Sequence, residues 1–163
     1  MPFTTVPDKA AGDVFTEAMW DTYIKDNLNY LWSTLNDVLA YKEVTNNVSV
    51  GGTGEAGATA IVTADPVVCD GTPIWVSFFC PRSSNTSGDC YVYLFQDGVS
   101  LGRIAYWQGS SSLFARRRIT PSAGTHTYSI RASRTGSSWD FAAGDGAGSG
   151  WAPIWIRVVK AVV

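Results

Sequence analysis

The chain contains one histidine, His126, and this residue is the best suited to acid–base chemistry. A catalytic base needs a nucleophile or an orienting carboxylate within hydrogen-bond reach, and none stands at a recognisable spacing from His126. In the stretch GTHTYSIRA, strand alternation places His126 with Tyr128 and Ile130 on an apolar face. For catalysis, folding would have to bring Cys80 or Asp140 to the ring. We therefore expect a structural histidine and no enzyme activity, with a small hydrolase centred on His126 as the least favoured alternative.

Residues that bind metals are scarce and poorly spaced. Cys69, Cys80 and Cys90 match no zinc pattern, and a single histidine leaves a four-ligand site short of nitrogen and sulfur donors. The stretch GDGAGSG offers only the Asp145 carboxylate, which is too little oxygen for a calcium loop. The sequence predicts neither a metal nor a cofactor, and it predicts buried thiols rather than a disulfide framework.

The stretch GTGEAG has the glycine spacing of a dinucleotide-binding loop, with Gly52, Gly54 and Gly57 at the three positions. That chemistry requires a helix N-terminus after the glycines to hold the pyrophosphate. The sequence continues instead as ATAIVTADPVV, which is rich in β-branched residues and predicts a strand. We therefore interpret the glycines as a flexible linker.

The run ARRRI and the seven tryptophans are the remaining candidates for binding a ligand. Alternation sends Arg116 and Arg118 to one face of a strand and Arg117 to the other, where it would need a partner if buried. An anion, a glycan, an acidic segment of a sister chain or solvent could face these arginines. Trp139, Phe141 and Trp151 are expected to anchor a long loop, and the two tryptophans are further candidates for a ligand or inter-subunit contact. Exposed tryptophans could stack on sugars, although packing in a core or an interface explains them more simply.

Strands must position these residues, because short apolar runs separated by turn clusters dominate the chain after residue 42. We expect a mainly β fold, an antiparallel β-sandwich or jelly roll of about eight strands. The stretch 134–153 fits neither the strand nor the helix period, and we expect it to be a functional or mobile loop. The expected strands are 43–50, 60–68, 73–80, 90–96, 99–107, 113–120, 125–132 and 153–162.

One of these strands, CYVYLF, is apolar on both faces. Val92 and Leu94 face one way, while Tyr91, Tyr93 and Phe95 face the other. In a single sandwich the outer set needs a cover, and a symmetric oligomer would supply one.

The front of the chain predicts an extended arm followed by one α-helix from Thr16 to about Ala40. The apolar residues of this helix recur at spacings of four and three, a coiled-coil-like stripe that one helix cannot bury alone. We therefore divide the chain into residues 1–42, the arm and an oligomerisation and attachment helix, and residues 43–163, the β domain. The stripe comprises Ile24, Leu28, Leu31, Leu35 and Val38, and Trp20, Tyr23, Asn27 and Trp32 flank it.

Composition and charge exclude several classes of partner. A hydrophobic content of 45% excludes a disordered chain, and a net charge of −2 gives no reason to expect binding to nucleic acid or an anionic membrane. Residues 1–43 hold three lysines and seven acidic residues, which is compatible with docking between copies. The start MPFTTVPDKAAG does not predict a signal peptide, and no apolar run approaches the roughly 20 residues that span a bilayer. We expect a protein made in the cytoplasm without membrane insertion.

The segment PFTT…AGDVFTEAMWDTYIKDNLNYL resembles the N-terminal motif of many tailed-phage and prophage virion proteins. In that motif an arm and a Gly-Asp/Glu-x-hydrophobic-Thr step precede an Asn/Asp-x-Tyr-Ile/Val-x-Asp-Asn-Leu helix. The resemblance covers about the first fifth of the chain, and Trp20-Asp21 stands where the family usually has Leu-Asn. The matching residues are Gly12, Asp13, Thr16, Asp21, Tyr23, Ile24, Asp26, Asn27 and Leu28. The β domain, with SAGTHTYSIRA and PIWIRVVKA, is similar in style to the trimeric jelly-roll heads of phage fibres.

The resemblance implies a non-enzymatic virion structural protein. It would form a homo-oligomeric appendage, with a trimer favoured, as a head decoration or fibre or as a tail-fibre or tail-tip component. The arm and helix would attach it to other capsid or tail proteins, so that it is made in the host cytoplasm and located in the virion. The alternative is a host-glycan receptor-binding module of the phage that uses exposed Trp and Tyr side chains and Arg116–Arg118.

Overall fold

The computed structural model describes residues 24, 38–85, 88–136, 139–147 and 150–161, and the chain divides into two units, Met1–Asp37 and Val38–Val163. The second unit is a β domain. The expected arm and helix lie outside the described residues, and so do Trp20, Tyr23, Asn27, Leu28, Leu31 and Leu35 of the expected stripe. Ile24 is described only as an isolated position, so the stripe stays a prediction.

The described residues of the β domain form thirteen strands, and every pairing between them is antiparallel. The prediction of a mainly β chain with antiparallel sheets is confirmed, while the number of strands exceeds the expected eight. The strands are β1 (Val38–Val44), β2 (Val48–Val50), β3 (Thr59–Thr63), β4 (Val67–Asp70), β5 (Ile74–Cys80), β6 (Arg82–Asn85), β7 (Cys90–Gln96), β8 (Val99–Trp107), β9 (Leu113–Ile119), β10 (Ala123–His126), β11 (Tyr128–Arg134), β12 (Trp139–Ala142) and β13 (Ile154–Lys160).

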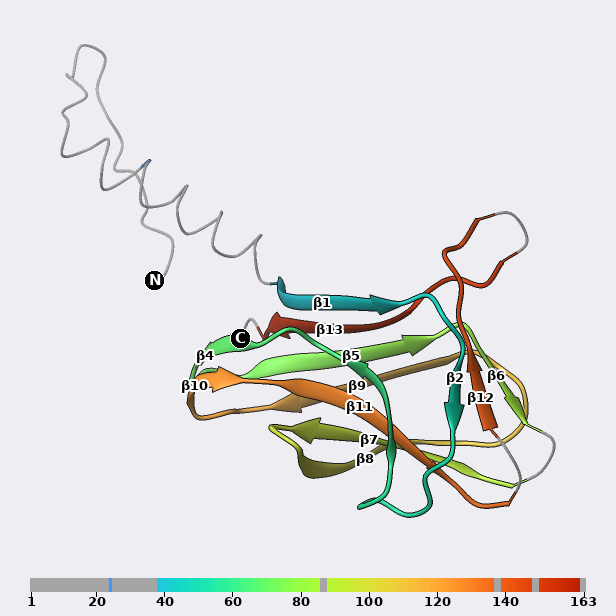
Figure 1. Cartoon of the computed structure of the whole chain (residues 1–163). Helices are drawn as coiled ribbons and strands as arrows, with labels where there is room; N and C mark the ends of the chain where they lie inside the picture. The colour runs from blue at the N-terminus through green and yellow to red at the C-terminus, as the bar shows by residue number, and fades with distance from the viewer. Residues whose placement is uncertain (1–23, 25–37, 86–87, 137–138, 148–149, 162–163) are drawn as a thin grey trace, which may run out of the picture. The chain divides into compact units, whose positions relative to one another are not determined.

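Two four-stranded sheets form the body of the domain. One has the order β1-β13-β5-β9 and the other the order β3-β11-β7-β8. A three-stranded sheet, β2-β12-β6, lies across one end of the long strands, and the pair β10-β4 lies at the opposite end (Figure 1). The β1-β13-β5-β9 sheet is called sheet A below, and the β3-β11-β7-β8 sheet is called sheet C.

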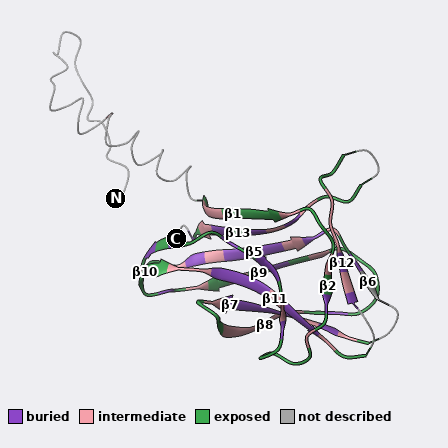
Figure 2. Ribbon diagram, viewed as in Figure 1, coloured by how far each residue is buried: buried purple, intermediate pink, exposed green. Residues whose placement is uncertain are grey.

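One core joins the four sheets. Buried residues run along the inner faces of β5, β7 and β11 (Figure 2), and they belong to a single hydrophobic cluster. Its largest fully buried side chains include Phe78 of β5, Tyr128 of β11, and Trp139 and Phe141 of β12. The inner faces of the two large sheets thus form the core, and a binding site would have to be sought on their outer faces.

The strand count is higher because several expected runs are broken by turns. The run 43–50 divides between β1 and β2, 60–68 becomes β3 and β4, and 125–132 becomes β10 and β11. Two further strands, β6 and β12, are short and lie in stretches that look like loops, the second within 134–153. The interpretation of 134–153 as a stretch without strands is therefore wrong for residues 139–142.

The expected helix is too long at its C-terminal end. Val38 begins β1 and pairs with Val159 of β13, so it does not belong to a helical stripe. The β domain correspondingly begins at Val38 and not at Glu43. The reason is tertiary pairing: four of the seven residues of β1, Leu39, Ala40, Lys42 and Glu43, favour a helix, and the hydrogen bonds to β13 override that local preference.

The glycines of GTGEAG form a compact turn rather than a flexible linker. The backbone N–H groups of Gly51 and Gly52 both donate to the Thr59 hydroxyl, at 3.2 and 3.0 Å. A Cβ at Gly52 would lie 2.0 Å from the carbonyl oxygen of Gly57, a distance that real side chains do not tolerate. A strand, β3, follows the turn, as expected, so no helix N-terminus is present to hold a pyrophosphate.

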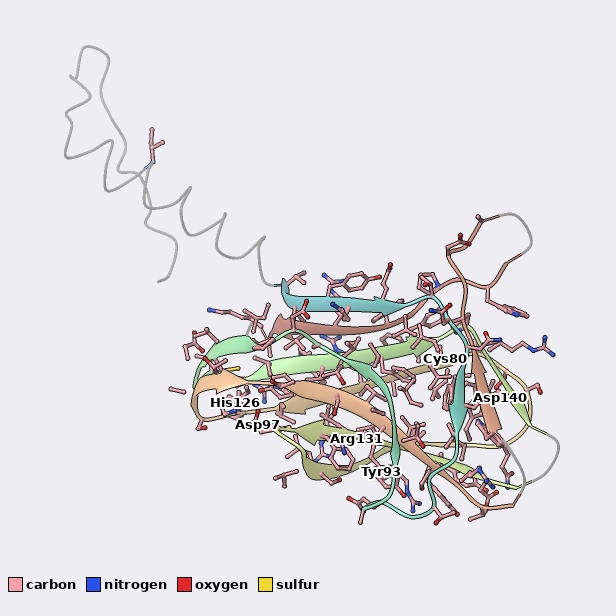
Figure 3. All side chains as sticks on the ribbon, viewed as in Figure 1. Cys80, Tyr93, Asp97, His126, Arg131 and Asp140 are labelled. Carbon is pink, nitrogen blue, oxygen red and sulfur yellow. The ribbon has the colours of Figure 1, made fainter. Side chains whose placement is uncertain are left out.

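The outer face of β7 is covered by the chain itself. Tyr93 and Phe95 are each only 4% exposed and pack with Ala58 in a small second cluster. Arg131 lies over the Phe95 ring, with its Cζ 4.4 Å from the ring centroid, and Figure 3 shows Arg131 close to Tyr93. The expectation that this strand requires an oligomer to cover it is wrong, because arginine stems and the turn before β3 exclude water from the aromatic rings.

The prediction of buried, unpaired thiols is confirmed, since Cys69, Cys80 and Cys90 are all free and buried. Burial raises the pKa of both Cys80 and Cys90 to about 12. These thiols therefore behave as apolar core residues at neutral pH.

Candidate functional site

The outer face of sheet A carries aromatic and arginine side chains from all four of its strands. Strand alternation produces this arrangement. In β5, Ile74, Val76 and Phe78 are buried in the core, while Trp75 and Phe79 are half-buried on the outer side. The face, called the aromatic–arginine face below, comprises Tyr41, Glu43, Trp75, Ser77, Phe79, Phe114, Arg116, Arg118, Trp155 and Arg157.

The strand register sets these side chains in rows across the sheet. Trp155 of β13 is paired with Phe79 of β5, which is paired with Phe114 of β9. Ring centroids are 5.7 Å apart for Phe79 and Trp155 and 6.1 Å apart for Phe114 and Trp155. Tyr41 of β1 is paired with Arg157 and adds to the row diagonally, with its ring centroid 6.1 Å from that of Trp155. The result is a continuous aromatic row across four strands.

Both ends of this row reach solvent. Phe114 is 59% exposed and Tyr41 is 46% exposed, although large apolar side chains are normally covered in a folded domain. The Tyr41 hydroxyl donates to the Glu43 carboxylate. Burial, together with this hydrogen bond, raises the pKa of Tyr41 to about 12 and keeps its hydroxyl protonated at neutral pH. An aromatic row with exposed ends is typical of a surface that binds another molecule.

Three arginines lie beside the row. Arg157 and Arg116 occupy the next row, on either side of Ser77, and Arg118 is paired with Trp75. In the described part of the chain, none of the three forms an ion pair with a carboxylate. Arg116 instead lies over the Trp75 ring, with its Cζ 4.1 Å from the centroid. The face thus offers positive charge together with apolar rings.

The sequence prediction separates Arg117 from its neighbours, and the structure bears this out. Arg117 is half-buried on the inner side of β9, and its Nη1 donates to the carbonyl of Leu101. Its guanidinium is therefore not available to a ligand on the outer face. Arg116 and Arg118 remain exposed on the outer side and are candidates for contact with a ligand.

The outer face of sheet C also carries aromatics, but its groups are already satisfied. Arg103 covers the Tyr91 ring, with its Cζ 4.1 Å from the centroid. The Asp89 carboxylate accepts hydrogen bonds from the hydroxyls of Tyr91 and Tyr106 and from the Gln108 amide. Because these internal contacts use the donors and acceptors, sheet C is the weaker candidate for a binding face.

The two loop tryptophans have different environments. Trp139 is fully buried and packs edge-on against Trp107, with 6.3 Å between the ring centroids. The expectation that Trp139 contacts a ligand or another subunit is therefore wrong. It does anchor the loop, as does Phe141. Trp151 is 44% exposed beside Arg82, whose Cζ is 5.1 Å from the ring centroid. Trp151 thus remains a candidate for contact with a ligand, but it does not belong to the aromatic row.

His126 is the last residue of β10, where it is paired with Val67, and β11, which carries Tyr128 and Ile130, begins two residues later. The His126 and Tyr128 ring centroids are 6.5 Å apart. His126 Nδ1 is 2.7 Å from Asp97 Oδ2, and Figure 3 shows His126 and Asp97 together, away from Cys80 and Asp140. Its Nε2 is 3.2 Å from the Ser122 hydroxyl and 3.0 Å from the Ser122 carbonyl oxygen.

This order of serine, histidine and aspartate resembles that of a hydrolase, but the ring has no free base. A carbonyl oxygen can only accept a hydrogen bond, so Nε2 must carry a proton to bond to it. The hydrogen bond to Asp97, followed by that to the Ser122 backbone, raises the pKa of His126. The geometry therefore favours an imidazolium that links two turns, and a protonated Nε2 cannot remove the proton of a serine.

Other kinds of site find no support among the described residues. No three His, Cys, Asp or Glu side chains in these ranges come together as metal ligands would. Within the same ranges, no helix has the length and hydrophobicity needed to cross a membrane.

The chain is similar to two solved carbohydrate-binding modules. The first is the module CBM6cm-2 of lichenase 5A from Cellvibrio mixtus, solved in complex with cellotriose. The match has 17% sequence identity and a TM-score of 0.37, and it covers 77% of this chain and 99% of that chain. The second is the C-terminal CBM6 of LamC, a marine laminarinase from Zobellia galactanivorans, with 16% identity, coverage of 77% and 90%, and a TM-score of 0.28. No family model and no curated protein matches the chain. At these identities and TM-scores, the ligand of this chain must be argued from its own side chains.

Most of the aromatic–arginine face escapes sequence reasoning. The run CYVYLF looks like the strand that needs an external cover, whereas IWVSFFC and IWIRVVK carry the exposed aromatic row. All three runs carry aromatic residues on the outer face, although the last two also carry Ser77 and Arg157 there. The difference depends on which outer faces the chain covers with its own arginines, and this is decided by contacts between distant strands.

Proposed function

We propose that the β domain is a glycan-binding module and that the aromatic–arginine face is its binding surface. The observation that carries the proposal is the aromatic row of Tyr41, Trp155, Phe79 and Phe114, which the chain leaves uncovered at both ends. Flat rings stack on the apolar faces of sugars, and adjacent arginines donate hydrogen bonds to sugar oxygens.

The dimensions of the row suit a chain of sugars rather than one ring. Neighbouring strands lie about 4.8 Å apart, so four strands extend the row over roughly 14 Å. Its residues come from paired strands and not from loops, which makes the spacing rigid. A rigid, extended platform binds an extended polymer without ordering a loop first.

Removal of one exposed ring tests this proposal. Phe114→Ala should weaken binding to polysaccharides from a broad panel, measured by affinity electrophoresis and calorimetry, while leaving the circular dichroism spectrum unchanged. Tyr106→Ala is the matched control, because Tyr106 is 49% exposed on the outer face of sheet C. Equal losses in both variants, or no binding of any polysaccharide by the unaltered chain, would contradict the proposal.

A second function is supported by the N-terminal motif alone. The stretch from Gly12 to Leu28 resembles the arm and helix of tailed-phage virion proteins, so the module would be an appendage of a virion, with trimers as the favoured state. In that setting the aromatic–arginine face could also contact a sister copy, since interfaces are enriched in aromatics and arginine.

Two measurements separate these functions. Immunogold labelling of virions from a phage carrying this coding sequence should decorate the head or the tail if the protein is an appendage. Light scattering of the purified chain gives its oligomeric state. A trimer that Phe114→Ala dissociates would assign the face to subunit contact, whereas an unchanged state with lost polysaccharide binding would assign it to the glycan.

A further inference from the structure

The centre of the aromatic–arginine face holds a small residue among large ones. Ser77 is 8% exposed, and its hydroxyl makes no hydrogen bond to another described residue but is not among the fully buried polar atoms, so its oxygen still reaches solvent. A hydroxyl without a protein partner can hydrogen-bond to a ligand at no cost to the fold. Its one open direction is outward, between the side chains that surround it.

Those side chains are fixed by register. Ser77 is paired with Arg157 of β13 on one side and with Arg116 of β9 on the other. Along β5 the next residues on the same face are Trp75 and Phe79. The hydroxyl therefore lies between two arginines in one direction and two aromatic rings in the other.

The two arginines are available to a ligand. Neither forms an ion pair in the described part of the chain. Contact with the Trp75 ring also holds the Arg116 guanidinium in place, which reduces the entropy lost when it binds. Glu43, the acid on this face, accepts from the Tyr41 hydroxyl at the far edge of the sheet.

We propose that Ser77, Arg116 and Arg157 form a subsite for the acidic group of a sugar, either a carboxylate or a sulfate ester. Guanidinium groups bind both oxyanions with paired hydrogen bonds, and the serine hydroxyl supplies a third donor from below. Phe79 would contact the sugar that carries the acidic group, while Trp75 positions the Arg116 guanidinium. This inference rests on the proposed glycan-binding function and names the class of glycan, an acidic polysaccharide.

The test compares polymers that differ only in the acidic group. Calorimetry would use a uronic-acid polysaccharide with its carboxyl-reduced form, and a sulfated polysaccharide with its desulfated form. We expect the acidic member of one pair to bind at least about tenfold more tightly, the effect of a hydrogen bond to a charged group. The pair that shows this difference identifies the acidic group as carboxylate or sulfate.

Variants locate the effect. Arg116→Gln and Arg157→Gln should each lower the affinity for the acidic polymer about tenfold and change the affinity for the neutral polymer little. Arg103→Gln is the matched control, because Arg103 makes the same kind of ring contact on the opposite sheet. Ser77→Asp should fold, since its carboxylate would form ion pairs with the two arginines. Those ion pairs should abolish the preference for the acidic over the neutral polymer. Ser77→Asn introduces no charge and should not occupy the arginines in this way.

The outcomes distinguish the two levels of the proposal. Equal binding of acidic and neutral polymers would overturn the subsite and leave glycan binding intact. A loss in Arg103→Gln as large as that in Arg116→Gln would show general charge attraction and would also overturn the subsite. Failure of every polymer to bind would overturn the proposed function together with the subsite. If Ser77→Asp does not fold, the two arginine variants still decide the question.

Discussion

Arg116 and Trp75 are in contact across two paired strands, with the guanidinium carbon 4.1 Å from the centre of the indole ring. The ring thus holds an exposed cation in a fixed orientation on β9, the edge strand of sheet A, next to Ser77. Planarity matters for this contact as much as charge does.

Arg116→Lys should therefore be an intermediate variant. It keeps the positive charge but loses the flat group that stacks on Trp75 and binds an oxyanion with two hydrogen bonds. We expect affinity for an acidic polysaccharide in the order unaltered chain, Arg116→Lys, Arg116→Gln, with about tenfold between the first and the last. If calorimetry finds Arg116→Lys equal to the unaltered chain, charge alone is sufficient.

Trp139→Ala should destabilise the domain strongly, because Trp139 is fully buried between Trp107 and the rest of the core. Truncation of a buried tryptophan costs about 3–5 kcal/mol of unfolding free energy. Trp139→Phe should cost less, since the Trp139 Nε1 makes no hydrogen bond within the described residues. Urea denaturation measures both variants. The control is Trp151→Ala at an exposed site, where a loss comparable to that at Trp139 would contradict the assigned burial.

Gly52→Ala should disrupt the turn before β3. The added Cβ would lie 2.0 Å from the Gly57 carbonyl oxygen, and backbone on both sides of the contact would have to move. We expect a loss of about 1–3 kcal/mol, as for other overpacked sites. Gly51→Ala is the neighbouring control, because a Cβ there meets nothing within 4 Å and should change stability by less than about 0.5 kcal/mol. Similar midpoints for the two variants in thermal denaturation would argue against this turn.

The contact between His126 and Asp97 should make stability depend on pH in a defined window. The pKa of His126 is raised above its ordinary 6.5, so its contribution is complete below about pH 6.5 and is lost as pH rises through the folded-state pKa. The pKa of Asp97 is lowered, chiefly by the Thr127 backbone N–H and then by His126, so its contribution is lost only in acid. The stability difference between the unaltered chain and His126→Gln should therefore be larger at pH 5.5 than at pH 8.5. A pH-independent difference in urea denaturation would exclude the charged contact.

The three thiols should be unreactive until the domain unfolds. With a pKa of about 12, Cys80 and Cys90 would each be ionised in about one molecule in ten thousand at pH 8, and both are buried. An aromatic disulfide reagent should label almost no thiol in buffer and three thiols per chain in concentrated urea. Rapid labelling of one cysteine in buffer would show that its strand opens locally.

The sequence is a good guide where period and turn chemistry act locally. β5, β7, β8 and β9 lie within one residue of the predicted runs at each end, and the division of Arg116 and Arg118 from Arg117 follows from alternation. Local reasoning fails where a strand depends on a distant partner. β12 exists because Trp139 pairs with Val50 on one side and Asn85 on the other, and neither pairing is visible in the sequence around it.

The candidate site shows the same division. That Arg116 would be exposed is predictable, but that Ser77 would lie between Arg116 and Arg157 requires the order β13-β5-β9. Likewise, nothing near His126 in the sequence indicates Asp97, which a different hairpin brings to it. Side chains that come together through sheet order cannot be paired from one sequence.

The position of β1 at the edge of sheet A has a mechanical consequence. β1 is bonded to β13 and to no other strand of that sheet, and it follows directly on the N-terminal unit of the chain. Tension applied through the N-terminus would reach β1 before any other strand of the domain. Peeling β1 away would remove Tyr41 and Glu43 from the aromatic–arginine face and leave Ser77 and both of its arginines in place. Pulling would therefore shorten the binding face by one strand, while the proposed subsite at its centre would still be able to bind a ligand.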